Sequence, residues 1–385
     1  MLEGLMLFLV ANNFLLMANS IGILMLGLYL WKSRLKIGVP KSKAIYVLIL
    51  ASLSFLVLYI KNYGMPETST MVLRYFLPII FFYLGEMNTK GLENKLKTYT
   101  LCIAFGSFVH GFSNIIINRN LDILSIAGRQ YNDVYGGVIT GTLQNLFFVF
   151  SCSLLAYGLL CENKKWLKVM ECLSAIIGVY GSIVNASRTM IYVTILVFMI
   201  ISFVHIWKKK SFSFAVFKWT GIGLFILIIV IIVLWLDLFH VQELFATTAL
   251  GRRQSVNVAG HTVFDNLRWQ YSSEILQQLP SHLLGGIEHN SYAHNLWVDV
   301  AREAGIIPFC LYILFSLIIC SNLWEFMNNS RLSHEIRILM LSIQLSCMLS
   351  FFTEPIMQGA PLIFSLYCYT CGSMISFNKR SIRKV

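Results

Sequence analysis

The feature that most constrains this chain is a series of long apolar runs separated by short polar connections. A helix needs about 20 apolar residues to cross a hydrocarbon layer of about 30 Å, and most of these runs have about that length. Only 12% of the residues are charged, against roughly 25% in soluble domains, so most of the chain is expected to lie in lipid. The runs lie near residues 5–30, 44–60, 71–85, 98–117, 137–160, 169–185, 189–206, 219–239, 305–323, 338–352 and 358–377. They predict an all-α polytopic membrane bundle of about 11 spans (about 10 to 12), forming one domain over residues 1–385.

Charge alternates along the chain, because every second connection between the runs is basic. The basic connections carry Lys32, Arg34, Lys36, Lys41 and Lys43; Lys90, Lys95 and Lys97; Lys164, Lys165 and Lys168; Lys208, Lys209, Lys210 and Lys218; Arg331 and Arg337; and Lys379, Arg380, Arg383 and Lys384. By the positive-inside rule these connections face the cytoplasm. With the run over 5–30 as one retained span, the N-terminus is then predicted outside and the C-terminus inside. The net charge of +12 reflects this orientation and does not imply nucleic-acid binding.

The one long connection, residues 240–292, falls on the predicted outer side. Its aromatic and aliphatic residues favour an ordered, functional loop over a disordered one. Residues 292–304 follow it with a helical pattern of apolar and polar positions, which predicts a short amphipathic helix at the outer membrane interface. With Ser291 as its N-cap, His294 would sit in the first turn. The helix dipole would keep that imidazole neutral and able to accept a proton, although a lone histidine is often structural.

Arginine and lysine are distributed unequally between the two predicted faces. Eight of the nine basic residues on the outer side are arginine, whereas sixteen of the twenty-one on the cytoplasmic side are lysine. The guanidinium fork binds phosphate or carboxylate in a bidentate manner that an ammonium group does not reproduce. The asymmetry favours an anionic substrate such as a pyrophosphate. The alternative is that individual arginines form structural ion pairs with nearby acidic residues.

Two charged residues stand out at the predicted outer surface. Arg188 lies between two apolar runs with almost no loop, and no acidic residue near it in the sequence neutralises it. Glu354 is the one acid at the outer end of the last helix pair. It is expected to neutralise an arginine or to orient His294 or an acceptor hydroxyl.

Metal and redox roles have little support in the sequence. The nine cysteines lie in or beside apolar runs, where a free cysteine behaves as a small buried hydrophobe. No metal-ligand spacing such as HExxH is present, and Cys368 and Cys371 lack the strand or histidine partner expected of a redox CxxC. No cofactor and no metal are therefore expected.

The polar motifs on the outer side resemble those of the O-antigen polymerase (Wzy-type) and O-antigen ligase superfamily of bacterial membrane glycosyltransferases. The resemblance covers roughly residues 125–355. It rests on Ser187-Arg188-Thr189, Arg268-Trp269, Pro280, Gly285-Gly286, His294-Asn295, Glu303 and Gly305, and more loosely on Arg129 with Gly137 and Asn145.

The resemblance implies a metal-independent, inverting transfer of a glycan from an undecaprenyl-pyrophosphate carrier to a sugar hydroxyl, on the outer face of the bacterial cytoplasmic membrane. It implies that Arg188 and Arg268 bind the pyrophosphate and that His294 acts as the base or as a group that orients the acceptor. Further pyrophosphate contacts are expected from Arg129, Arg252 and Arg253, and supporting roles from Asn295, Arg302, Glu303 and Glu354.

The predicted activity is polymerisation of polysaccharide repeat units of the O-antigen or capsular kind. The expected partners are the carrier-linked donor and acceptor glycans and membrane lipid, together with a chain-length regulator and a flippase. Several separate groups of outer arginines favour two anionic substrates, as a polymerase needs. The alternatives are a ligase that moves the glycan to another acceptor and, in a different class, a transporter of lipid-linked sugars.

Overall fold

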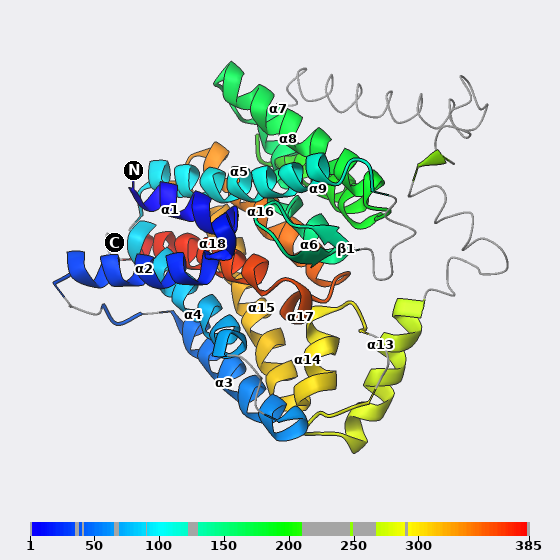
Figure 1. The fold of residues 1–385 in the computed structure, drawn as a ribbon. Coiled ribbons are helices and arrows are strands. Elements are labelled where there is room, and N and C mark those ends of the chain that lie inside the picture. The colour runs from blue at the N-terminus through cyan, green and yellow to red at the C-terminus, as the bar shows by residue number, and fades with distance from the viewer. Residues whose placement is uncertain are drawn as a thin grey trace.

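A computed structural model shows a bundle of helices with one small two-stranded sheet (Figure 1). The structure describes residues 2–34, 38–40, 42–64, 69–89, 91–121, 130–209, 247–248, 267–288 and 292–382. The elements are α1 (Leu2–Ala11), η1 (Phe14–Leu16), α2 (Ala18–Lys32), α3 (Lys43–Tyr63), α4 (Ser69–Thr89), α5 (Glu93–Ile117), β1 (Gln130–Asn132), β2 (Val138–Thr140), α6 (Gly141–Leu146), α7 (Val149–Leu160), α8 (Lys165–Val184), α9 (Thr189–Lys209), α13 (Leu267–Gln278), η4 (Leu279–Ser281), α14 (Leu296–Ala304), α15 (Ile306–Asn328), α16 (His334–Phe351), α17 (Ile356–Gly359) and α18 (Pro361–Ile382).

The described residues form an all-α bundle of membrane type. Six segments are long and apolar enough to cross a membrane: Lys43–Tyr63, Glu93–Ile117, Gly141–Leu160, Lys165–Val184, Thr189–Ile206 and Ile306–Asn328. The run over 219–239 and most of the connection over 240–292 lie outside the described residues. The total of about 11 spans stays a prediction.

The first apolar run is a helical hairpin, so the prediction of one span over 5–30 is wrong. Lys32, at the end of α2, forms an ion pair with Glu3, at the start of α1, with 3.0 Å between Nζ and Oε1. The two helices are therefore antiparallel, with the start of α1 beside the end of α2. At 1.5 Å per residue they are about 15 and 22 Å long, and neither reaches across a layer of about 30 Å. The N-terminus lies on the same side as Lys32, contrary to the predicted orientation.

Polar residues in the middle of the run cause this turn. Asn13 has a left-handed φ of 49°, and Leu15, with φ of 51°, is also non-helical, so the helix cannot continue. The side chain of Asn12 donates to the carbonyl of Gly106 on α5 at 3.3 Å, and the backbone carbonyl of Asn12 contacts the His110 ring, also on α5. Helix α5 thus satisfies polar groups that lipid would leave unpaired.

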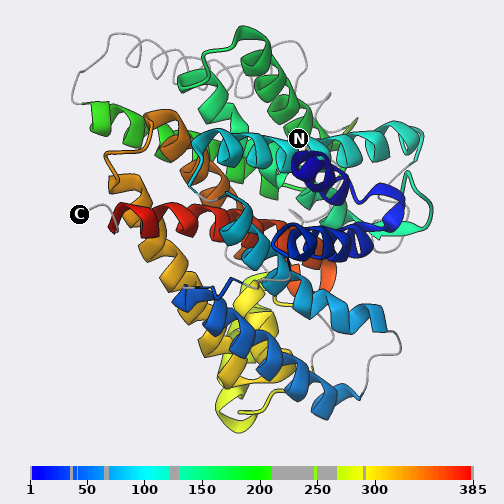
Figure 2. The same ribbon diagram turned by 90° about the vertical axis from the view of Figure 1, so that its left-hand side faces the viewer.

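Glycines allow the helices to approach closely. In α4, a Cβ on Gly85 would lie 2.1 Å from the carbonyl oxygen of Tyr369; in α18, a Cβ on Gly372 would lie 2.0 Å from that of Phe82. The two helix backbones are therefore in direct contact, which is how small residues promote association of membrane helices. Figures 1 and 2 show the C-terminal helix α18 running through the middle of the bundle.

The basic connections lie together at one end of the bundle. Lys97, near the start of α5, forms an ion pair at 2.7 Å with Glu162, which follows α7, and lies 3.8 Å from Glu335 at the start of α16. Ser333 Oγ donates to Glu93 at 2.6 Å. The connections α4–α5, α7–α8 and α15–α16 thus meet, which agrees with the prediction that all three lie on the same side of the membrane. We call this the basic end.

Candidate functional site

A buried carboxylate, Glu354, joins several helices at the end of the bundle opposite the basic end. It lies between α16 and α17 and is 2% exposed. Thr189 Oγ1, from the first residue of α9, donates to Oε1 at 2.7 Å, and Thr142 Oγ1, from α6, donates to Oε2 at 3.4 Å. His294 Nδ1 lies 3.8 Å from Oε2, and Arg268 Nη1 lies 3.9 Å from Oε1. We call these five residues the Glu354 site.

The environment keeps Glu354 charged. Burial acts to raise the pKa of its carboxyl, but the interactions with His294, Arg268 and Thr189 outweigh burial and hold the pKa below its ordinary value. A buried carboxylate needs such partners, because an isolated charge in a low-dielectric interior is costly. The site therefore carries one negative charge beside one arginine and one histidine.

His294 is held in a strained turn before α14. Its φ of 56° is left-handed, which is unusual for a residue other than glycine. Asp299 fixes the turn: its carboxylate accepts hydrogen bonds from the backbone N–H groups of Ala293 at 2.7 Å and of Asn295 at 3.1 Å. Strain of this kind commonly marks functional positions.

The predicted start of this helix is wrong by several residues. Asn295 is the N-cap, because its side chain accepts from the N–H groups of Trp297 and Val298 at 3.1 and 3.2 Å. Asn295 thus stabilises the start of α14, and the supporting role expected of it in the site stays a prediction. His294 precedes the helix instead of lying in its first turn, and Ser291 lies outside the described residues.

All nine residues of α14 are buried in the protein, so its polar face is not exposed to water, and its position at the outer membrane interface stays a prediction. Its polar side chains are satisfied within the protein: Arg302 donates to Glu303 at 2.7 Å and lies over the Tyr292 ring at 4.5 Å. Burial raises the pKa of Glu303, although Gln358 and Arg302 act to lower it. Arg302 and Glu303 form a structural ion pair, the alternative that the sequence left open for individual arginines.

Two glycines let the chain fold closely over the end of α14. Gly285 has a φ of 81°, and a Cβ there would lie 2.5 Å from the Glu303 carbonyl oxygen. Gly305 has a φ of 80°, and a Cβ there would lie 2.2 Å from the Leu283 carbonyl oxygen. Only glycine fits both the conformation and the space. Gly285 lies between α13, which carries Arg268, and α14, whereas Gly305 joins α14 to α15.

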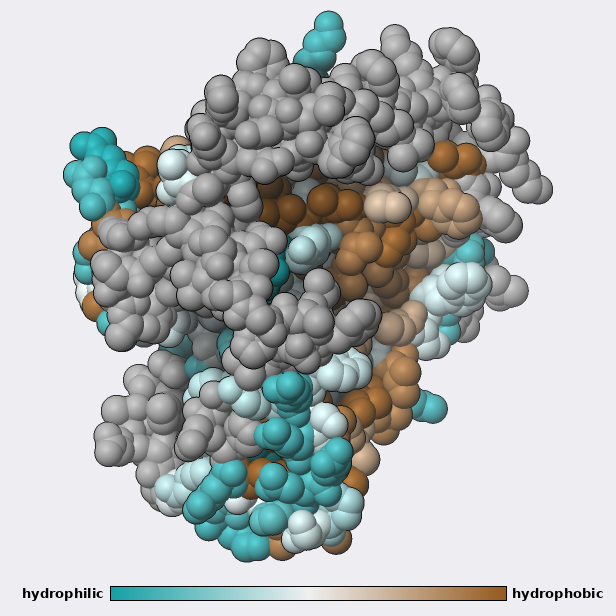
Figure 3. All heavy atoms as spheres, turned by 90° about the vertical axis from the view of Figure 1, so that its right-hand side faces the viewer, coloured by the Kyte–Doolittle hydropathy of each residue, from teal (hydrophilic) through white to brown (hydrophobic). Residues whose placement is uncertain are grey.

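Arg268 reaches the site from α13. Its Nη1 donates to the carbonyl of Thr353 at 2.6 Å, next to Glu354 in the chain. The guanidinium is therefore anchored to the connection between α16 and α17. On the face drawn in Figure 3, hydrophilic residues gather at the lower end beside an apolar surface. Helix α13 contributes exposed polar residues of this kind, including Glu274, Gln277 and Gln278.

Arg188 lies in a turn that is tightly held while its own side chain is exposed. Asn145 fixes the turn by donating to Ser187 Oγ at 2.6 Å and accepting from Ser182 Oγ at 2.8 Å. The next residue after Arg188 is Thr189, which binds Glu354. The backbone carbonyl of Arg188 accepts from the N–H of Tyr192 at 3.1 Å, whereas its guanidinium has no hydrogen bond or ion pair among the residues that the structure describes.

The structure thus unites some predicted site residues and separates others. Glu354, His294 and Arg268 are in contact, and Arg188 is adjacent through Thr189. Thr142 and Thr189 were not predicted as ligands of Glu354, since single threonines carry no sequence signal. Three predicted pyrophosphate ligands lie outside the described residues: Arg129, Arg252 and Arg253.

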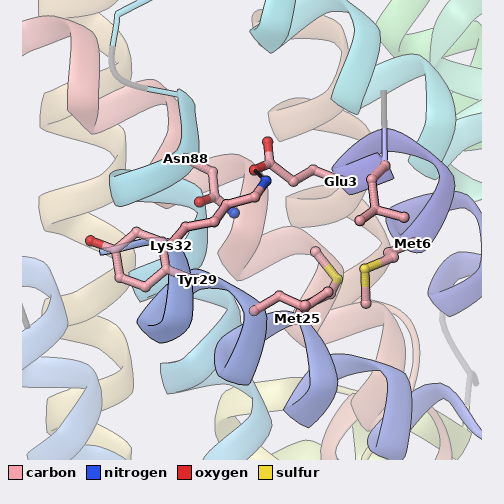
Figure 4. A pocket seen from close by; sticks show the side chains of 8 residues that line it. Glu3, Met6, Met25, Tyr29, Lys32 and Asn88 are labelled. Atoms are coloured by element: carbon pink, nitrogen blue, oxygen red, sulfur yellow. Dashed lines mark hydrogen bonds and ion pairs between the residues drawn. The ribbon is translucent and has the colours of Figure 1, made fainter. Parts of the chain in front are cut away.

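A small pocket lies at the basic end, away from this site (Figure 4). It is lined by residues of α1, α2 and α4, including Glu3, Tyr29, Lys32 and Asn88. None of the predicted site residues lines it. The groups able to perform chemistry on an anionic substrate are gathered at the Glu354 site instead.

No protein-family model matches this chain, and no curated protein matches it either.

Proposed function

We propose that this protein polymerises lipid-linked polysaccharide repeat units on the outer face of the bacterial cytoplasmic membrane. The observation that carries the proposal is the Glu354 site, next to which the chain places the exposed Arg188 through its neighbour Thr189. A carboxylate next to a histidine and an arginine, with a second guanidinium that has no partner among the described residues, suits a reaction that removes a hydroxyl proton and stabilises a departing phosphate.

In the proposed reaction, His294 accepts the proton of the acceptor sugar hydroxyl. The hydroxyl oxygen attacks the anomeric carbon of the donor glycan as the bond from that carbon to the carrier pyrophosphate breaks. The electron pair of that bond stays on the pyrophosphate oxygen. Arg188 binds this developing charge, for which a guanidinium is well shaped. Attack opposite the leaving group inverts the anomeric configuration.

Glu354 prepares His294 for this role. A hydrogen bond from Nδ1–H to the carboxylate would leave Nε2 as the proton acceptor, and the charge of Glu354 would stabilise the imidazolium that forms. The present separation of 3.8 Å is longer than a hydrogen bond. Catalytic hydrogen bonds are often long before substrate binds, so we expect this one to shorten in the complex.

The distribution of cations favours an enzyme over a transporter. A flippase is expected to carry cationic groups through the membrane depth to pass an anionic headgroup. In the described part of the chain, Arg302 is the one buried lysine or arginine, and Glu303 neutralises it. Exposed Arg119 and Arg188 lie in separate groups, which supports the two carrier-linked substrates of a polymerase.

The test supplies purified full-length protein with a single-repeat undecaprenyl-pyrophosphate glycan and no other acceptor. The proposal predicts a ladder of longer carrier-linked chains. If no ladder forms, but glycan is transferred once a lipid A core or protein acceptor is added, the protein is a ligase. If neither product forms and vesicles containing the protein translocate the carrier-linked glycan, the transporter class replaces both.

A further inference from the structure

Three metal-ligating side chains meet at the basic end, far from the Glu354 site. They are Cys161, which caps the end of α7, His205 on α9, and His334, the first residue of α16. His205 Nδ1 lies 3.7 Å from Cys161 Sγ and 2.8 Å from His334 Nε2. All three candidate ligand atoms lie within 4.8 Å of one another.

These separations are close to those of a tetrahedral zinc site. With Zn–N bonds of about 2.05 Å and a Zn–S bond of about 2.3 Å, ligand nitrogens lie about 3.3 Å apart and nitrogen and sulfur about 3.6 Å apart. The sulfur–nitrogen distance of 3.7 Å matches directly. The two imidazole nitrogens share a hydrogen bond, so metal binding would replace its proton and separate the nitrogens by about 0.5 Å.

The surroundings fit a buried, reduced metal site. Cys161 and His205 are buried, and His334 is partly buried. The cluster adjoins the basic connections, which the positive-inside rule assigns to the cytoplasm, where thiols stay reduced. Nitrogen and thiolate ligands in this combination prefer Zn²⁺ to Mg²⁺ or Ca²⁺.

The neighbouring acid does not complete the ligand set. Glu162 follows Cys161, but its carboxylate accepts from the N–H of Lys164 at 2.9 Å and from the hydroxyl of Tyr157 at 3.2 Å. It also forms the ion pair with Lys97 at 2.7 Å. Among the residues that the structure describes, no fourth histidine, cysteine or acid joins the group, which leaves the fourth position there to water or to a small ligand.

We propose that Cys161, His205 and His334 bind one Zn²⁺ ion that ties α7, α9 and α16 together at the basic end. Cys161 and His205 are 44 residues apart, and His205 and His334 are 129 residues apart, so they form no short sequence motif. The site is independent of glycan transfer. Its role is structural: it closes long loops between helices that already pack against one another, and so holds their ends in place.

The test uses full-length protein in detergent without a histidine tag, stripped with a chelator and then titrated with Zn²⁺. The wild type should retain about one zinc per chain after dialysis, and zinc should raise its unfolding temperature. With Co²⁺ in place of zinc, visible bands of a tetrahedral ion and a thiolate charge-transfer band should appear.

Matched variants assign the ligands. Cys161→Ser should abolish the charge-transfer band, and His334→Gln should weaken zinc binding at least about 10-fold and remove the thermal shift. Cys310→Ser, at an exposed cysteine, should behave as the wild type. His334 is only partly buried, so its variant keeps the test valid if Cys161→Ser fails to fold. The proposal is wrong if the wild type retains no zinc, or if His334→Gln binds zinc as tightly as the wild type.

Discussion

At the scale of single residues, the charge of Glu354 links folding to the candidate chemistry. Its carboxylate is buried and hydrogen-bonded to Thr189, and it faces both Arg268 and His294. Removing that charge leaves the Arg268 guanidinium without its counter-ion and His294 without its acidic neighbour. Glu354→Gln should therefore lower the free energy of unfolding at neutral pH by about 1–3 kcal/mol. It should also reduce the rate of glycan transfer.

The pH dependence of stability checks the same residue. The folded protein holds the pKa of Glu354 below its ordinary value, which is about 4.3 in an unfolded chain. A lowered pKa stabilises the fold above the unfolded value, and this stabilisation is lost as the pH falls through the folded pKa. The unfolding temperatures of wild type and Glu354→Gln should differ near pH 7 and converge below about pH 4. A constant difference across this range would show that the carboxylate is not the cause.

Substitution of Arg188 tests whether the shape of its guanidinium or only its positive charge is needed for glycan transfer. Arg188→Lys keeps the charge but loses the bidentate fork, so transfer should fall about 100-fold while the protein still inserts and folds. Arg331→Lys, at an exposed arginine of the basic end between α15 and α16, is the matched control and should retain wild-type activity. If the Arg188→Lys variant makes polymer at nearly the wild-type rate, the positive charge at this position is sufficient and the guanidinium geometry is not required.

The residues of the site were only partly predictable. Sequence reasoning reached Glu354, His294, Arg268 and Arg188, because charged groups beside apolar runs are costly and therefore conspicuous. It missed Thr142 and Thr189, whose role depends on which helices meet. It also placed His294 inside a helix, because the capping of α14 by Asn295 and the left-handed turn before it depend on contacts with Asp299.

At the scale of elements, glycine contacts decide how closely helices pack. Gly85→Ala would push a Cβ into the carbonyl of Tyr369, so α4 and α18 must separate. We expect a loss of about 1–3 kcal/mol, measured as a lower unfolding temperature in detergent. Gly27→Ala is the matched control: no atom lies within 4 Å of a Cβ there, and alanine should be neutral or stabilise α2 by up to about 1 kcal/mol. Equal effects of the two substitutions would refute the packing explanation.

Hydropathy predicted most elements well, and it failed where an apolar run hides a break. The spans over 44–60, 98–117, 169–185 and 189–206 correspond to α3, α5, α8 and α9. The run over 5–30 has the length of a span, but its turn depends on polar partners supplied by α5. The prediction of an amphipathic helix likewise implied that the polar face of α14 meets water. Periodicity shows that a face is polar, but it does not show whether other parts of the protein cover that face.

At the scale of the whole molecule, the hairpin of α1 and α2 changes the predicted orientation of the N-terminus. Single cysteines at Leu2 and Lys165, in a background without Cys310 and Cys320, should react with an impermeant thiol reagent only after the membrane is opened. A cysteine at Ser281, in the segment between α13 and α14, should react in intact cells. If cysteines at Leu2 and at Ser281 both react in intact cells, the N-terminus lies outside and the first run crosses the membrane once, contrary to the hairpin.

The central claim is that the Glu354 site carries out glycan transfer, and the rate of ladder formation by purified His294→Ala tests it most directly. Removing a general base should slow the reaction about 100- to 10,000-fold, with the protein still folded and eluting as the wild type does. His282→Ala is the matched control, because His282 is an exposed histidine of the same segment whose imidazole, among the described residues, makes local hydrogen bonds to Ser281 and Gln278. The account predicts a ladder from His282→Ala and none from His294→Ala. A ladder of wild-type rate from His294→Ala would contradict it.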